Sequence, residues 1–295
     1  MENLSTNVRS KQFTISEKLE FGKKRPEHLG KVATNIFLLP HRTFPSRKEK
    51  DILSLGEMSQ FQRNGKNITY WHWKNPGKQV LLIHGWNGHS GNLSRFVQPL
   101  LDLGLSVVSL DLPGHGSSEG KFCNIVLSAE TIVDLVKIVG SPSLIISHSF
   151  GGAVATVAQE LGVSVEKAVY ISPPSRLELL REVFSKSLGL DDSVKEEMRM
   201  RMERKIHRSL DSLDLERSGK VLDSELLVIH DESDNEVPFI MGKRVARAWK
   251  KGSFFPTKGL GHQMILRSED VIEKAVQFIA KETIEEKNLL RLNLV

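Results

Sequence analysis

The chain has very little cysteine and no long apolar segment. A single cysteine, Cys123, occurs in 295 residues, which excludes an internal disulfide and a multi-cysteine metal site and fits a reducing compartment. The polar first residues lead into no apolar signal-peptide core, and no later stretch stays apolar long enough to span a bilayer. We therefore expect a cytoplasmic protein without stable membrane insertion.

The sequence also lacks blocks of charge of one sign. The net charge is +5, but basic and acidic residues are interleaved over most of the length. This pattern is typical of a solvated surface, so we expect no nucleic-acid partner. The length allows one large domain with an inserted cap and a sizeable core.

Short apolar runs alternate with segments of helical periodicity. Continuously apolar runs are typical of strands buried on both faces, and they alternate with helical patterns along the chain. Strands are predicted at 79–83, 105–110, 144–146, 166–172, 225–230 and 253–256, and helices at 126–139, 238–249 and 268–284. Asn64-Gly65 between two β-rich runs predicts an antiparallel hairpin over 59–73. The fold class is therefore α/β, a mostly parallel sheet with helices on both faces.

This alternation stops between residues 173 and 222. No buried strand occurs there, and Met198, Met202, Ile206 and Leu210 recur at helical spacing with arginines between them. We interpret this stretch as an inserted helical cap whose apolar stripe covers a pocket and whose arginines, Arg201 among them, face solvent. The predicted organisation is an N-terminal extension over 1–55, loosely helical after a tail of about a dozen residues, a core over 56–172 and 223–295, and a cap over 173–222.

One serine stands where a strand turns sharply into a helix. The strand at 144–146 runs into Ser147-His-Ser-Phe-Gly151, and a helix is predicted to begin at Gly151. Such a turn places the residue at its apex, Ser149, in a strained backbone conformation with its side chain projecting from the sheet edge. Small neighbours are needed for close packing, and Ser147 and Gly151 supply them. Ser149 is therefore the candidate nucleophile.

These residues resemble the G-x-S-x-G nucleophile elbow of the α/β-hydrolase superfamily, with Ser147 in place of the first glycine. A second segment, Asp111-Leu-Pro-Gly-His-Gly-Ser-Ser118, is similar to the superfamily's D-x-P-G-x-G-x-S turn, whose role is mainly structural. With two later loops, the resemblance covers residues 60 to 280. It implies the α/β-hydrolase fold and a lidded serine hydrolase similar to carboxylesterases and lipases.

The resemblance implies a base late in the chain, on the loop after the last strand. His262 follows the predicted strand at 253–256 and precedes the last helix. Histidine suits the task because its ordinary pKa lies near neutrality. Two other histidines are weaker candidates: His230 lies before the possible acids, and His148 lies beside the nucleophile on a sharp turn, where adjacent side chains point apart. We assign His148 to packing or to a hydrogen bond under the elbow.

The acid of the triad is expected on the loop after the penultimate strand, where it orients the imidazole. Aligning Val237-Pro238 with the same pair in the superfamily's acid loop places Asp234 in the catalytic position. Three other carboxylates compete with it and are interpreted as solvated or as capping the following helix: Asp231, Glu232 and Glu236.

Two backbone N–H groups are expected to stabilise the oxyanion. One belongs to Phe150, the residue after the nucleophile. The other, implied by resemblance to the H-G-x motif, belongs to Trp86 in His84-Gly85-Trp86. Because these donors are backbone groups, the side chains of Trp86 and Phe150 are expected to line the pocket.

The predicted function is cleavage of a carboxylic ester through an acyl-enzyme, with a small to medium acyl substrate as the partner and with no metal or cofactor. The same triad also serves thioesterases, amidases, peptidases, C–C hydrolases and cofactor-free acyltransferases, and these alternatives stay open at the level of sequence. A non-catalytic hydrolase-fold binding protein is a further alternative. The presence of all three triad residue types in the expected order argues against it.

Overall fold

The computed structural model describes residues 25–292, with side chains described up to residue 280. The predicted tail at the N-terminus and most of the basic stretch around residues 21–26 lie outside the described residues. In the described part of the chain, no helix is both long enough and apolar enough to cross a membrane.

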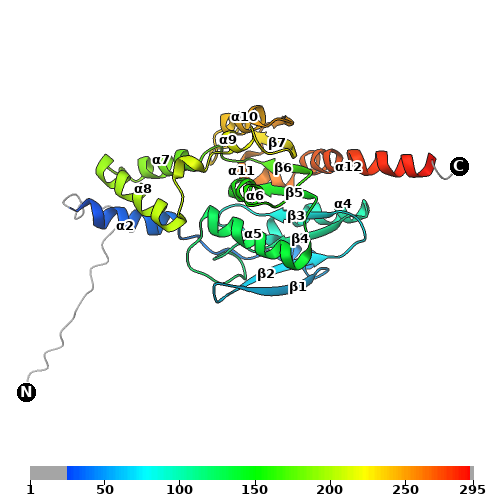
Figure 1. The fold of residues 1–295 in the computed structure, drawn as a ribbon, viewed down its shortest axis with the longest axis horizontal. Coiled ribbons are helices and arrows are strands. Elements are labelled where there is room, and N and C mark those ends of the chain that lie inside the picture. The colour runs from blue at the N-terminus through cyan, green and yellow to red at the C-terminus, as the bar shows by residue number, and fades with distance from the viewer. Residues whose placement is uncertain (1–24, 293–295) are drawn as a thin grey trace, which may run out of the picture.

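The centre of the molecule is one eight-stranded sheet with the strand order β1-β2-β4-β3-β5-β6-β7-β8. β1 and β2 are antiparallel to their neighbours, and the pairs from β4 through β8 are parallel (Figure 1). The strands are β1 (Glu57–Arg63), β2 (Lys66–Trp73), β3 (Gln79–Ile83), β4 (Ser106–Leu110), β5 (Leu144–His148), β6 (Lys167–Ile171), β7 (Glu225–Asp231) and β8 (Gly252–Thr257). The predicted α/β class and the predicted strands are confirmed, with ends that differ by one or two residues.

The hairpin is also where the sequence predicts it. Asn64 and Gly65 join β1 to β2, and both have positive φ, 49° and 67°. Such a pair makes the tight turn whose twist matches that of the two strands.

Helices cover both faces of the sheet, and alternate strand residues point to each. On one face, alternate strand residues such as Leu81 and Ile145 pack with α5 (Ile125–Val139), α6 (Phe150–Glu160) and α10 (Phe239–Ala248). On the other, Leu82 and Ile146 pack with η1 (Ser90–Phe96), α4 (Val97–Asp102), α3 (Arg47–Leu53) and α12 (Glu269–Leu292). This double coverage explains why the middle residues of most parallel strands are apolar whichever face they point to.

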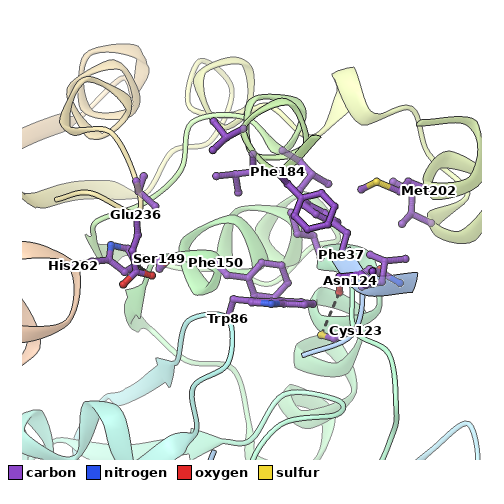
Figure 2. A pocket seen from close by; sticks show the side chains of 18 residues that line it. Phe37, Trp86, Cys123, Asn124, Ser149, Phe150, Phe184, Met202, Glu236 and His262 are labelled. Atoms are coloured by element: carbon purple, nitrogen blue, oxygen red, sulfur yellow. Dashed lines mark hydrogen bonds and ion pairs between the residues drawn. The ribbon is translucent and has the colours of Figure 1, made fainter. Parts of the chain in front are cut away.

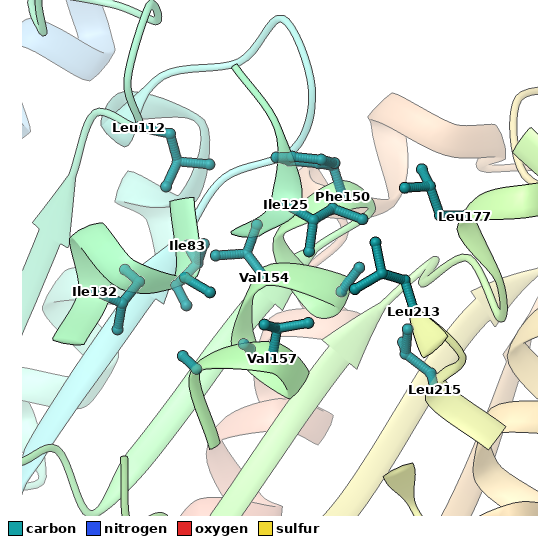
Figure 3. Close-up of a cluster of buried hydrophobic side chains, with 14 of the residues drawn as sticks. Ile83, Leu112, Ile125, Ile132, Phe150, Val154, Val157, Leu177, Leu213 and Leu215 are labelled. Carbon is teal, nitrogen blue, oxygen red and sulfur yellow. The ribbon is translucent and has the colours of Figure 1, made fainter. Parts of the chain in front are cut away.

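The segment between β6 and β7 is helical, as predicted for an inserted cap. It contains α7 (Leu177–Ser187), α8 (Asp192–Ile206), η2 (Leu210–Ser212) and α9 (Leu215–Ser218). Figure 3 shows that cap residues such as Leu177 and Leu213 continue the apolar cluster that begins at Ile83 in the sheet. The predicted apolar stripe of the cap is buried.

The cap arginines face open solvent less than predicted, because several pair with carboxylates. Arg199 binds Asp211 at 2.7 Å, and Arg201 pairs with Glu197 one helical turn away. An amphipathic helix can thus place its charged residues in local ion pairs that the sequence pattern alone does not specify.

Gly151 permits the close contact between the elbow helix and the sheet. A Cβ at this position would lie 2.4 Å from the carbonyl oxygen of Ile83 and 2.7 Å from that of His84. Both obstacles are backbone atoms of β3 and the following loop, so neither can move aside cheaply. A side chain here would therefore push α6 away from the sheet.

We expect Gly151→Ala to lower the free energy of unfolding by about 2 to 3 kcal/mol, despite the better helix propensity of alanine. Urea denaturation measures this. The matched control is Gly152→Ala, whose Cβ would meet the Cβ of Pro173 at 3.2 Å, a contact that a shift of a few tenths of an ångström relieves. An equal or smaller loss for Gly151→Ala than for Gly152→Ala would show that the backbone contact is not limiting.

Candidate active site

Ser149 occupies the apex of the turn between β5 and α6. Its backbone angles, φ 51° and ψ −121°, lie in a region that non-glycine residues rarely adopt. Its N–H donates to the carbonyl oxygen of Ile171 at the end of β6, at 2.8 Å. The strained turn that the sequence predicts is therefore present, and it places the serine side chain at the carboxyl ends of the parallel strands.

Asp234 and His262 are brought together from two loops that follow β7 and β8. The Nδ1 atom of His262 lies 2.7 Å from Oδ2 of Asp234, and both side chains are almost fully buried. The other carboxylate oxygen, Oδ1, accepts from the N–H groups of Glu236 at 3.0 Å and Val237 at 2.8 Å. These bonds hold the carboxylate in place beside the imidazole.

Asp234 stays ionised although it is buried. Burial raises the pKa of a carboxyl, but hydrogen bonds from His230, His262 and the N–H of Val237 outweigh burial and hold the pKa of Asp234 well below its ordinary value. A carboxylate that is ionised at neutral pH can stabilise positive charge on the neighbouring imidazole.

The sequence did not reveal that His230 also contacts the Asp234 carboxylate. Its Nε2 lies 3.3 Å from Oδ2 of Asp234 and 3.0 Å from the carbonyl oxygen of Val237, and the side chain is fully buried. Its position at the end of β7, four residues before Asp234 in sequence, was the only available signal. His230 is thus a neighbour of the acid rather than a rival base.

The two predicted oxyanion donors lie on facing turns. In the described part of the chain, the N–H groups of Trp86 and Phe150 donate to no protein acceptor. For Phe150 this is the ordinary state of the first turn of a helix, whose N–H groups point outward. The Trp86 and Phe150 rings pack edge to face at 5.1 Å and line the cavity, as predicted.

A cavity of about 310 Å³ lies between these turns and the cap. Ser149 and His262 border it, with no hydrogen bond between the two in the structure, and its walls are mostly apolar. Catalytic pairs without substrate commonly have such loose geometry. Figure 2 shows Ser149 and His262 on one side and Phe37, Phe184 and Met202 toward the other. The size is at the lower end of the range for small-molecule sites, about 300 to 1000 Å³.

The match to a known family covers most of the sheet and the cap. Residues 80–275 match the model described as the alpha/beta hydrolase family. The chain belongs to this family. The human monoglyceride lipase is 28% identical over 137 residues, which are 42% of this chain and 45% of that protein. The monoacylglycerol lipase of Mycolicibacterium smegmatis is 32% identical over 101 residues, 30% of this chain and 36% of the relative. This alpha/beta hydrolase thus matches less than half the length of either relative.

Solved structures show the same fold as this alpha/beta hydrolase. The esterase Pf2001 of Pyrococcus furiosus superposes with a TM-score of 0.62 at 18% identity, over 82% of this chain and 98% of that one. Est1E of Butyrivibrio proteoclasticus, solved with ferulic acid, gives the same TM-score at 18% identity, over 76% and 98% of the two chains.

The prediction for Asp231 was wrong. It is fully buried and neither solvated nor a cap of the next helix. Its carboxylate accepts from the N–H groups of Gly261 at 3.0 Å and Leu260 at 3.1 Å, and from the hydroxyl of Thr257 at 2.8 Å. Asp231 therefore ties the acid loop to the loop that carries His262. The sequence gives no sign of this, because the two loops are far apart in the chain.

His148, like Asp231, is bonded to the loop that carries His262. Its Nε2–H donates to the carbonyl oxygen of His262 at 2.9 Å, and the two rings are in contact at a tilt of 44°, with centroids 4.7 Å apart. Burial lowers the pKa of His148 to about 3, so the ring is neutral and available as this donor. The sequence-based assignment to packing and a hydrogen bond agrees with these contacts, but the partner loop was not predicted.

Proposed function

We propose that this alpha/beta hydrolase cleaves carboxylic esters with Ser149 as nucleophile, His262 as base and Asp234 as the acid that orients it. The observation that carries the proposal is that a strained serine and a histidine border the same apolar cavity, and that this histidine is hydrogen-bonded to a buried aspartate behind it. Fold similarity alone does not assign chemistry, but this set of groups is what acyl transfer requires.

In the proposed reaction, His262 Nε2 removes the proton of the Ser149 hydroxyl as its oxygen attacks the ester carbonyl. The negative charge on the carbonyl oxygen is stabilised by the N–H groups of Trp86 and Phe150. His262 then gives its proton to the departing alcohol, leaving Ser149 acylated. Water, deprotonated by His262, releases the carboxylic acid and restores the serine.

The mostly apolar cavity supports an acyl substrate of small to medium size. Two relatives are named monoacylglycerol lipase and monoglyceride lipase, and these names describe enzymes that cleave esters. Hydrolysis of thioesters, amides and C–C bonds uses the same triad. Substrates that differ in their leaving group therefore distinguish these activities from ester hydrolysis. A non-catalytic binding protein would leave all of these substrates intact.

We expect the protein to hydrolyse p-nitrophenyl butyrate at least about 100-fold faster than the matched p-nitroanilide. The physical reason is that an amine leaves only after protonation, a step for which general acid catalysis is worth about 10² to 10⁴. Steady-state rates at neutral pH measure the ratio. Faster turnover of the anilide would favour an amidase, and turnover of neither by the folded protein would contradict hydrolysis of esters.

A further inference from the structure

Part of the cavity wall comes from a segment that the family match does not include. The matched residues begin at 80, yet Ile36, Phe37 and Leu38 line the cavity together with residues of α7 and α8. They stand at the end of helix α2 (Pro26–Phe37). The predicted N-terminal extension therefore reaches the substrate side of the molecule.

Helix α2 is packed against the cap in a fixed position. Figure 1 shows it beside α8, on the same side of the sheet. Leu29 and Ala33 are buried in the apolar cluster that α8 shares. At Gly30 the helices approach so closely that a Cβ would lie 2.5 Å from Cγ of Glu197 and 3.2 Å from the backbone nitrogen of Met198.

The residues after α2 are bonded to the core. The carbonyl oxygen of Leu38 accepts from the N–H of Cys123 at 2.9 Å. Arg42 donates to three carbonyl oxygens of the turn that follows β4, at 2.6, 2.8 and 3.2 Å; these belong to Gly116, Ser118 and Gly120. A guanidinium that spans three carbonyls holds the segment in one place.

The same segment contacts the loop of the oxyanion donor. Asn87 directly follows Trp86, and its Oδ1 accepts from the N–H of His41 at 2.7 Å. Its carbonyl oxygen accepts from the hydroxyl of Thr43 at 2.5 Å. The N-terminal segment is thus anchored at both the cap and the oxyanion turn, and Phe37 lies between these anchors.

Phe37 meets Phe184 of α7 across the cavity. The two rings pack edge to face with centroids 5.1 Å apart, and both line the cavity. In Figure 2 they lie above Trp86 and away from Ser149. An acyl chain bound to Ser149 and extending along the apolar wall would therefore meet this aromatic pair.

We propose that the segment 26–43 holds an acyl-selecting wall in place, which it forms with Ile36, Phe37 and Leu38, and that the Phe37–Phe184 pair limits the length of the acyl chain. This inference rests on the proposed ester hydrolysis and specifies its substrate class: esters whose acyl chain ends before the aromatic pair. Each methylene in a hydrophobic pocket changes specificity by about 10-fold or more, so the limit is measurable.

The test compares kcat/KM for p-nitrophenyl acetate, butyrate, octanoate and decanoate in the wild type, Phe37→Ala and Phe184→Ala. We expect both variants to raise the decanoate-to-butyrate ratio by about 10-fold or more. Phe37→Leu, which keeps most of the volume, should change it less. The control is Phe44→Ala, which removes a ring that is 64% exposed and does not line the cavity; its profile should match the wild type.

Labelling of each variant by an active-site fluorophosphonate separates the two proposals. Variants that label and hydrolyse butyrate but keep the wild-type length profile would overturn the acyl-selecting wall and leave ester hydrolysis intact. A wild-type protein that neither labels nor hydrolyses any ester would overturn both. If Phe37→Ala fails to label through misfolding, Phe184→Ala gives the same decision, because it removes the other ring of the pair.

Discussion

Replacing Ser149 by alanine should lower kcat for p-nitrophenyl butyrate by about 10⁶-fold. Loss of a triad serine removes the covalent path altogether, and the residual rate comes only from the oxyanion donors and substrate binding. The loss should appear in kcat, with a KM close to that of the wild type, because the serine hydroxyl contributes little to binding the ground state.

The matched control for this variant is Ser147→Ala on the same turn. Ser147 is fully buried, and its hydroxyl has no hydrogen-bond partner in the described part of the chain. Removing an unpartnered buried hydroxyl is nearly neutral for folding, so activity should stay within a few-fold of the wild type. A Ser149→Ala protein with more than about a tenth of wild-type activity would assign the nucleophile elsewhere.

Asp234→Asn should lower kcat by about 10⁴-fold while the protein stays folded. An amide of nearly the same shape can hold the imidazole in the wrong tautomer and cannot stabilise its positive charge. Asp234 is well placed for this role, since it is ionised and contacts His262 Nδ1 at 2.7 Å. The measurement is steady-state hydrolysis of p-nitrophenyl butyrate, with circular dichroism to verify the fold.

Glu232→Gln is the control for Asp234→Asn. Glu232 is an exposed carboxylate on the same loop, so its loss tests whether charge on the loop alone affects the rate. We expect activity within a few-fold of the wild type. Equal losses in the two variants would mean that Asp234 acts through the general field of the loop and not through its bond to His262.

The sheet could be predicted from the sequence because its signals are local. Runs such as 80–83 are apolar at every position, since both faces of each parallel strand are covered, and Asn64-Gly65 specifies its turn by backbone conformation. The turn at Ser149 could also be predicted from a local signal. Small residues around one serine, between a strand and a helix, are sufficient to predict its strained geometry.

Contacts between distant loops could not be predicted in this way. Asp231 and Gly261 lie 30 residues apart, and His148 and His262 lie 114 apart. No periodicity or turn chemistry connects such positions, so Asp231 was mistaken for a solvated side chain. The packing of α2 against α8 could not be predicted either. The sequence of an amphipathic helix indicates which face is buried but not which element covers that face.

The most direct test of the account is the site at which a fluorophosphonate probe attaches. Incubation of the wild type with the probe, followed by peptide mass spectrometry, should give one adduct, on Ser149. Ser149→Ala should give none, and Ser147→Ala should label as the wild type does. Labelling of Ser149→Ala at the wild-type rate, or an adduct on another residue, would contradict the assignment of Ser149 as the nucleophile.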